Sequence, residues 1–393
     1  MPPAAAFAIT PSVHKTPLNL TLPNRNAGFS FLVRNFDAQD DRFASAFGIL
    51  EKAIAARAFP ACLLAVTFCG ELVAQKALGR FTYDPASPQV TTASIFDLAS
   101  LTKILATTAA AMILYERGLL DLDAPVSAIV PEFADDDDHR REITLRMLLA
   151  HSSGLPAYEK LFLLAQTRED LLQAAFTTPL AAAPGARAEY SDIGFIILGV
   201  VLERLADEPL DAFCQREIFG PLGMTHTTFN PTPALRDCIP PTADDRTFRH
   251  RIIQGEVQDE NASALGGIAG HAGLFSTAED LAIFAHAMLN GGHPILRSST
   301  IELFSRRESA PDGTSRALGW DTPSAPSQSG KYFSPRSFGH LGYTGTSLWI
   351  DPDRQLSIAL LSNRTWPDCQ NQAIKQVRPA FHDAVMEVLG AYG

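Results

Sequence analysis

The chain of 393 residues, 46% of them hydrophobic, is long enough to bury a large core in one large domain or two intertwined ones. Its formal charge of −11 and scattered basic residues argue against nucleic acid as a partner. No uncharged run approaches the roughly 18 apolar residues of a membrane span, and no metal-ligand spacing is present, so we expect no membrane span, metal or other cofactor.

The first segment, residues 1–41, carries several prolines and predicts a poorly structured extension. It lacks the basic start and apolar stretch of a secretory signal. We therefore expect a cytoplasmic protein, with a periplasmic location as the alternative if an export signal is missing from the sequence. The oligomeric state is left open.

From residue 42 onward, helical and strand-like patterns alternate. A helix is expected over 42–58, followed by an antiparallel hairpin of 61–68 and 72–78. A strand-like run, 94–99, leads into a helix over 104–117. A second hairpin, 346–350 with 356–361, and a final helix over 373–389 close the chain.

Strands at both ends of the sequence enclose a stretch, about 121–270, that reads as mostly helical with many loops. This order predicts an α+β fold in which distant segments build one antiparallel sheet flanked by helices. The helical stretch is then an inserted subdomain that leans on the sheet.

The sharpest motif is Ser100-Leu-Thr-Lys103, at the junction of a strand-like and a helix-like run. Residues three apart share one face of a helical turn, so the hydroxyl and the amine are neighbours. A nucleophilic serine needs an adjacent base, and a lysine can serve if burial destabilises its ammonium. The alternative is a helix N-terminus with Ser100 as its cap.

A second candidate segment is Tyr190-Ser191-Asp192, just before an apolar helix expected over 193–206. Tyr190 can shuttle a proton if a nearby Lys103 ammonium holds the pKa of its phenol down. The alternative is a tyrosine packed at a helix start, with Ser191 or Asp192 as the N-cap.

The third segment, Gly339-His340-Leu-Gly342-Tyr343, opens the C-terminal hairpin. Glycines on a strand let a substrate backbone approach closely, and a strand N–H paired with that of Ser100 can form an oxyanion hole. His340 can bind a substrate carboxylate or orient Tyr190, or it is a surface histidine beside a bulge.

Together these segments resemble the serine β-lactamase and penicillin-binding-protein superfamily, whose members carry a Ser-x-x-Lys, a Tyr/Ser-x-Asn and a Lys/His-x-Gly motif in this order. The tyrosine version is similar to the branch of class C β-lactamases, DD-peptidases and family VIII esterases. Two further segments match the same branch, Leu148-Leu-Ala-His-Ser-Ser-Gly-Leu-Pro156 and Pro221-Leu-Gly-Met224. The resemblance implies a β-lactamase-like catalytic domain over 42–393.

The resemblance also implies roles for single residues. Ser100 would be the nucleophile, and Lys103 and Tyr190 would share the general-base and general-acid duty. The N–H groups of Ser100 and Tyr343 would form the oxyanion hole, with His340 and Gly342 along the strand edge. Two histidines, His151 and His271, are expected to be structural, with the alternative that the glycine-rich loop of His271 borders the cleft.

Two positions depart from the family pattern. Asp192 stands where the family has an asparagine that contacts the substrate, and His340 replaces a permanently charged lysine. Both changes weaken recognition of an anionic β-lactam, unless Lys103 neutralises Asp192. We therefore predict a serine hydrolase that acts on a small ester, amide or peptide, as a carboxylesterase or DD-peptidase with at most weak β-lactamase activity. The alternative is an inactive protein that only binds a ligand or partner.

Overall fold

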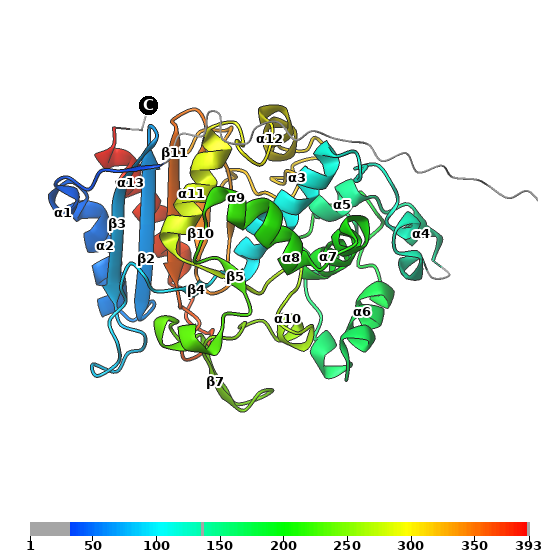
Figure 1. The fold of residues 1–393 in the computed structure, drawn as a ribbon, viewed down its shortest axis with the longest axis horizontal. Coiled ribbons are helices and arrows are strands. Elements are labelled where there is room, and N and C mark those ends of the chain that lie inside the picture. Colours follow the sequence, from blue (N-terminus) through cyan, green and yellow to red (C-terminus); the bar gives the residue numbers. More distant parts are fainter. Residues whose placement is uncertain (1–31, 135–136, 391–393) are drawn as a thin grey trace, which may run out of the picture.

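A six-stranded sheet forms one side of the molecule in the computed structural model, which describes residues 32–134 and 137–390 (Figure 1). Strand order across it is β1 (Val33–Arg34), β3 (Glu71–Gly79), β2 (Ala61–Phe68), β11 (Leu356–Ser362), β10 (Ser347–Asp351) and β9 (Phe338–Leu341). All neighbours are antiparallel except β1 and β3. The expected sheet built from both ends of the chain is thus confirmed.

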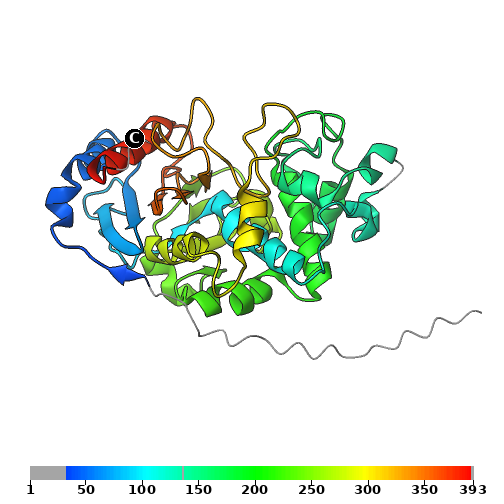
Figure 2. The same ribbon diagram turned by 90° about the horizontal axis from the view of Figure 1, so that it is seen from above.

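Helices cover both faces of this sheet, and two hydrophobic clusters fill the spaces between the layers. On one face α2 (Ala44–Ala55) packs against α13 (Ile374–Val388), and on the other α11 (Ala278–Leu289) lies over β2 and β11 (Figures 1 and 2). The central strands β2 and β11 are therefore buried along nearly their whole length, as their continuous apolar sequences require.

The remaining strands are short. They form a three-stranded sheet of β4 (Phe96–Asp97), β8 (Leu274–Ser276) and β5 (Thr228–Phe229), and a hairpin of β6 (Ala243–Asp245) and β7 (Arg251–Ile253). The run expected as a strand over 94–99 is therefore a strand only at 96–97, because the chain turns there into the segment that carries Ser100.

Most of the other helices lie between β4 and β8 and make up the second side of the molecule (Figure 2), whereas α1 packs beside α2 at the edge of the sheet (Figure 1). α7 is buried through most of its length, which explains why its sequence is apolar on every face. The helices are α1 (Gln39–Arg42), α3 (Ala109–Glu116), α4 (Asp138–Arg141), α5 (Leu145–Leu149), α6 (Arg168–Thr177), α7 (Asp192–Ala206), α8 (Leu210–Cys214), α9 (Gly220–Leu222), α10 (Glu260–Ala264) and α12 (Ser298–Ser305).

Three expectations need correction. The predicted extension covers residues 1–41, of which 1–31 lie outside the described residues. The described part is not unstructured, because it forms β1 and most of α1. The helix expected over 104–117 begins as a π-helical segment, Lys103–Thr108, and continues as α3. The helical stretch 210–219 likewise divides into α8 and a π-helical segment, Gln215–Phe219. Periodicity does not distinguish these helix types.

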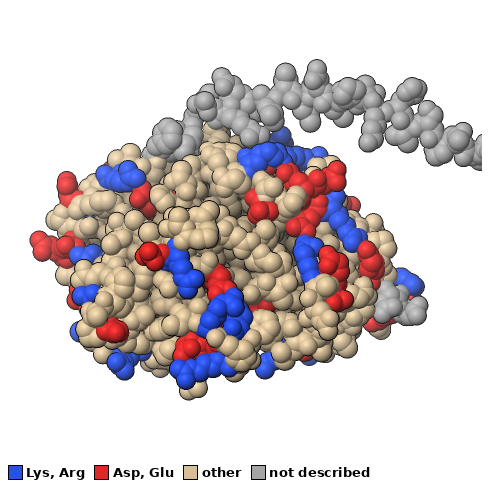
Figure 3. Space-filling model, turned by 60° about the horizontal axis from the view of Figure 1, so that its bottom comes forward, with Lys and Arg blue, Asp and Glu red and all other residues tan. Residues whose placement is uncertain are grey.

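No helix within 32–134 or 137–390 combines the length and the apolar character needed to cross a bilayer. On the face drawn in Figure 3, acidic and basic side chains are interspersed, without a continuous basic stripe.

Candidate active site

Ser100 lies on a short 3-10 turn, Ala99–Leu101, that directly follows β4. Ala99 has a left-handed φ of 47°, a strained conformation for a residue with a side chain. The carboxylate of Asp97 accepts a hydrogen bond from the Ala99 N–H at 2.8 Å, and the Thr102 hydroxyl donates to the Ala99 carbonyl at 2.7 Å. These bonds hold the turn that presents Ser100 to a cavity of about 710 Å³.

Lys103 is completely buried beneath Ser100. Its Nζ donates to Ser100 Oγ at 3.0 Å, to Asp192 Oδ1 at 2.7 Å and to the His271 carbonyl at 2.9 Å. Burial lowers the pKa of the Lys103 amine, and the neighbouring Asp192 carboxylate opposes this effect. An ammonium has three N–H donors, so this environment satisfies the charged form while burial makes it less stable.

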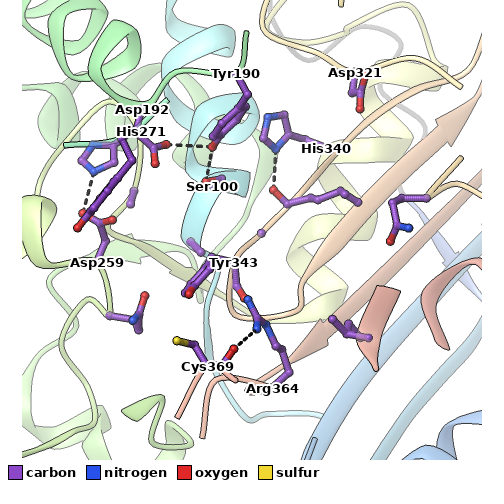
Figure 4. Close-up of a pocket in the computed structure, with 18 of the residues that line it drawn as sticks. Ser100, Tyr190, Asp192, Asp259, His271, Asp321, His340, Tyr343, Arg364 and Cys369 are labelled. Atoms are coloured by element: carbon purple, nitrogen blue, oxygen red, sulfur yellow. Dashed lines mark hydrogen bonds and ion pairs between the residues drawn. The ribbon is translucent and has the colours of Figure 1, made fainter. Parts of the chain in front are cut away.

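Tyr190 completes the contacts of the Ser100 hydroxyl (Figure 4). Its phenolic oxygen lies 2.7 Å from Ser100 Oγ and 3.0 Å from Asp192 Oδ1. Burial and the Asp192 carboxylate raise the pKa of the Tyr190 phenol well above its usual value. The condition that Lys103 hold this pKa down is therefore not met, because burial and the adjacent Asp192 carboxylate both raise it.

Asp192 is the first residue of α7 and bridges the amine of Lys103 and the phenol of Tyr190. The cap of this helix is Ser191, whose hydroxyl accepts from the Gly194 N–H at 3.0 Å. The condition set for an anionic substrate is met while Lys103 carries its proton, because the ammonium then forms an ion pair with Asp192 at 2.7 Å.

His340 lies on β9 with its ring 5.9 Å from that of Tyr190. The side chain is buried, and Nδ1 lies 2.7 Å from the Leu341 carbonyl. Burial and the positive charges of Lys103 and Arg316 lower the pKa of His340 to about 3, so the ring is neutral at pH 7. It supplies no positive charge where the family has a lysine.

The segment that follows β9 is hydrogen-bonded to the residues before Ser100. The hydroxyls of Thr344 and Thr346 donate to the carbonyls of Asp97 and Leu98 at 2.8 and 2.9 Å. At Gly342 a Cβ would lie 1.9 Å from Thr346 Oγ1 and 2.5 Å from the Leu98 carbonyl, so only glycine fits. Close packing between the two segments, rather than backbone freedom, explains this glycine.

A family model described as Beta-lactamase matches residues 46–378. The chain belongs to the beta-lactamase family. It is a serine hydrolase with the mixed α/β architecture of the serine beta-lactamase and transpeptidase superfamily.

Among curated members of this family, a putative D-alanyl-D-alanine carboxypeptidase of Escherichia coli (strain K12) is 33% identical over 343 residues, which cover 78% of this chain and 79% of that protein. An N-acetylmuramyl-L-alanine amidase of Bacillus subtilis (strain 168) is 34% identical over 353 residues, or 80% and 79% of the two chains. The names of these two relatives describe cleavage of different bonds.

Solved structures with the same fold include EstCE1, a hydrolase with promiscuous acyltransferase activity. It has a TM-score of 0.74 and 22% identity, and covers 88% of this chain and 99% of its own. An octameric penicillin-binding protein homologue from Pyrococcus abyssi has a TM-score of 0.70 and 21% identity, with coverage of 89% and 78%.

The two histidines expected to be structural occupy different places. His151 accepts from the Ser191 N–H at 3.1 Å and packs 4.8 Å from the Tyr190 ring, so it supports that segment. His271 lines the cavity instead, with Nε2 2.8 Å from Asp259 Oδ1 and its carbonyl on Lys103. The glycine-rich sequence on both sides of His271 is the one feature of the sequence that indicated a position at the cavity.

Two cavity residues, Asp259 and Arg316, were not identified in the sequence. Asp259 caps α10 by accepting from the Ala262 N–H at 2.7 Å, an arrangement typical of any helix start. Arg316 stands near a Leu-Gly-Trp sequence that carries no chemistry of its own. Neither belongs to a motif, and tertiary packing alone brings them to the cavity.

Proposed function

We propose that this serine hydrolase cleaves a small peptide or amide through an acyl-enzyme on Ser100, with D-alanyl-D-alanine carboxypeptidase-type cleavage as the first candidate. One observation carries the proposal. The Ser100 hydroxyl faces the Lys103 amine at 3.0 Å and the Tyr190 phenol at 2.7 Å, at the wall of a cavity large enough for a short peptide. The names of the curated relatives support cleavage of an amide bond.

In the proposed acylation step, Lys103 is the base. The pKa of its amine is lowered toward neutral pH, whereas that of the Tyr190 phenol is raised away from it, so of the two groups the amine is the better suited to be the base. The uncharged amine takes the Ser100 proton while Oγ bonds to the acyl carbon. The N–H groups of Ser100 and Tyr343 are assigned to the oxyanion that forms.

Tyr190 is the proposed acid for the leaving group. It gives its phenolic proton to the departing nitrogen or oxygen as the acyl bond breaks. The Lys103 proton then returns to Tyr190 through Asp192 Oδ1, which lies 2.7 Å from the amine and 3.0 Å from the phenol. Water repeats these transfers in deacylation, which releases the acid and restores Ser100.

A second candidate is a carboxylesterase. Neutral His340 favours it, because a cavity without the lysine charge of the third motif accepts an uncharged ester more readily than the family pattern does. Both candidates share the acyl-enzyme and differ only in the leaving group.

The test compares wild type with Ser100→Ala on 4-nitrophenyl acetate, an acylated D-alanyl-D-alanine peptide and a chromogenic cephalosporin. We expect cleavage of the peptide, the ester or both, slow or no cleavage of the cephalosporin, and a loss of about a thousandfold or more in Ser100→Ala. Equal rates for the two proteins on all three compounds would instead identify a binding protein without turnover.

A further inference from the structure

Asp97, the last residue of β4, has a buried carboxylate that no cation pairs with in the part of the chain that the structure describes. Each of its oxygens accepts one backbone N–H instead. Oδ1 accepts that of Ala99 at 2.8 Å, and Oδ2 accepts that of Gln258 at 2.7 Å. The first bond lies within the turn that carries Ser100, and the second comes from a segment 161 residues further along the chain. A single side chain therefore joins the turn of the nucleophile to a distant segment.

The distant segment forms part of the wall of the cavity. Gln258 and Asp259 both line it, and Asp259 Oδ1 lies 2.8 Å from His271 Nε2. The His271 carbonyl in turn accepts from the Lys103 amine at 2.9 Å. The wall that Asp97 holds is therefore connected, through His271, to the proposed base.

The turn itself depends on such bonds, because Ala99 has a φ of 47°, which a residue with a side chain rarely adopts. A third segment meets Asp97 as well: the Thr344 hydroxyl donates to its carbonyl at 2.8 Å, directly after Tyr343. A displacement of about 1 Å at a reacting atom can cost about a hundredfold in rate. The bonds that hold this turn therefore bear on the reaction.

The charge of Asp97 does not stabilise the fold. Burial raises the pKa of Asp97 to about 6, the nearby Asp259 carboxylate adds to this rise, and the two N–H bonds and the charge of Arg249 only partly oppose it. The other groups that face it, on β8 and at Thr344, are uncharged. Its contribution to the free energy of unfolding is present below the ordinary pKa of an aspartate and is lost as pH rises through about 6.

Asp245 shows the contrast. Burial acts to raise the pKa of its carboxyl too, but bonds from backbone N–H groups and an ion pair with Arg249 at 3.0 Å lower it overall. Asp97 has no such partner among residues 32–134 and 137–390. A stabilising role alone does not account for an unpaired charge at this position.

We propose that the Asp97 carboxylate is a positioning residue, which holds Ser100 against the Gln258–Asp259 wall for attack on the acyl carbon. Both of its oxygens accept an N–H only in the ionised form, since protonation turns one oxygen into a donor. One of the two backbone bonds is then lost. The reactivity of Ser100 should therefore fall as pH decreases through about 6, in addition to the loss caused by protonation of Lys103. This inference rests on Ser100 as the nucleophile.

Amide NMR spectra of the wild type test the bridge without turnover and without a variant. The amide protons of Ala99 and Gln258 donate to the same carboxylate, so we expect their chemical shifts to change together with one midpoint at about pH 6. Two different midpoints, or no change of either signal between about pH 4 and 8, would overturn the proposal.

The rate at which a fluorophosphonate labels Ser100 measures the effect on the nucleophile. Asp97→Asn replaces one acceptor oxygen with a donor at every pH, so we expect labelling to slow about 10- to 100-fold. The ionisation near pH 6 should disappear from the pH profile of the labelling rate, and that of Lys103 should remain. Asp97→Glu keeps a carboxylate and should restore part of the rate. A slower rate with an unchanged pH profile would identify a merely structural role and overturn the proposal.

Asp280→Asn is the matched control. Asp280 is buried, accepts the His226 N–H at 2.8 Å and has a pKa raised by burial, but it does not line the cavity. This variant should be labelled at the wild-type rate and with the wild-type pH profile. Equal slowing by Asp280→Asn, or a wild-type rate in folded Asp97→Asn, would overturn the proposal. If Ser100 is not the nucleophile, the wild type itself is not labelled there, so the two failures are distinct.

Discussion

The two walls of the cavity differ in how completely their polar groups are bonded to one another. On the helical side, Ser100, Lys103, Tyr190 and Asp192 contact each other at 2.7 to 3.0 Å. On the strand side, His340 Nε2 is buried with no partner in the described part of the chain, and the Arg316 guanidinium is held only loosely. The first wall is arranged for proton transfer, and the second holds a guanidinium whose donors no described residue accepts.

Changes on the helical wall should therefore reduce turnover of every substrate, and the largest effect is expected for Lys103→Ala. This variant removes the proposed base, so we expect kcat/KM to fall by about a thousandfold or more on all substrates. Steady-state hydrolysis of 4-nitrophenyl acetate measures it, with Lys160→Ala as the control that loses an exposed lysine. Retention of more than a tenth of the wild-type rate by Lys103→Ala would assign the base to another group.

Tyr190→Phe removes only the phenolic oxygen and keeps the ring that packs on His151. Loss of the proposed acid should lower kcat by about a hundredfold or more. The fall should be larger for an amide than for a 4-nitrophenyl ester, whose leaving group needs no proton. An equal loss on both substrates would show that the hydroxyl only positions Ser100.

Asp192→Asn should change the pH dependence and also lower kcat, because an amide cannot carry the proton from Lys103 back to Tyr190. The amine of Lys103 accepts a proton only when it is uncharged, so the rate rises as pH passes its pKa. Asp192 raises that pKa, and asparagine would let it fall. The acidic limb of the kcat/KM profile should therefore move to lower pH. An unchanged limb, or one moved upward, would show that another group titrates.

Gly342→Ala tests the contact between the walls. Its Cβ would overlap Thr346 Oγ1 and the Leu98 carbonyl, so we expect a loss of about 1–3 kcal/mol in the free energy of unfolding and reduced turnover. Gly48→Ala, in α2 with no atom within 4 Å of the added Cβ, is the control. It should stabilise the protein by about 0.5–1 kcal/mol, the smallest effect predicted here. Denaturant titration measures both, and equal effects would contradict the packing argument.

The contrast between the walls also describes what the sequence could predict. Ser100, Lys103 and Tyr190 lie in short motifs, and the two hairpins are apolar runs joined by short turns that local sequence specifies. Asp259 and Arg316 come from segments without a motif, and only the packing of the folded chain places them at the cavity. The rise in the pKa of the Tyr190 phenol could not be predicted for the same reason, since it depends on burial of the phenol and on its contact with Asp192. The cytoplasmic location stays a prediction.

The measurement that tests the account most directly is labelling with a fluorophosphonate, followed by intact mass and peptide mapping. The account predicts one phosphonyl adduct on the peptide that contains Ser100, no adduct in Ser100→Ala, and greatly slowed labelling in Lys103→Ala. A folded wild-type protein that remains unmodified, or that carries the label on another residue, would contradict it.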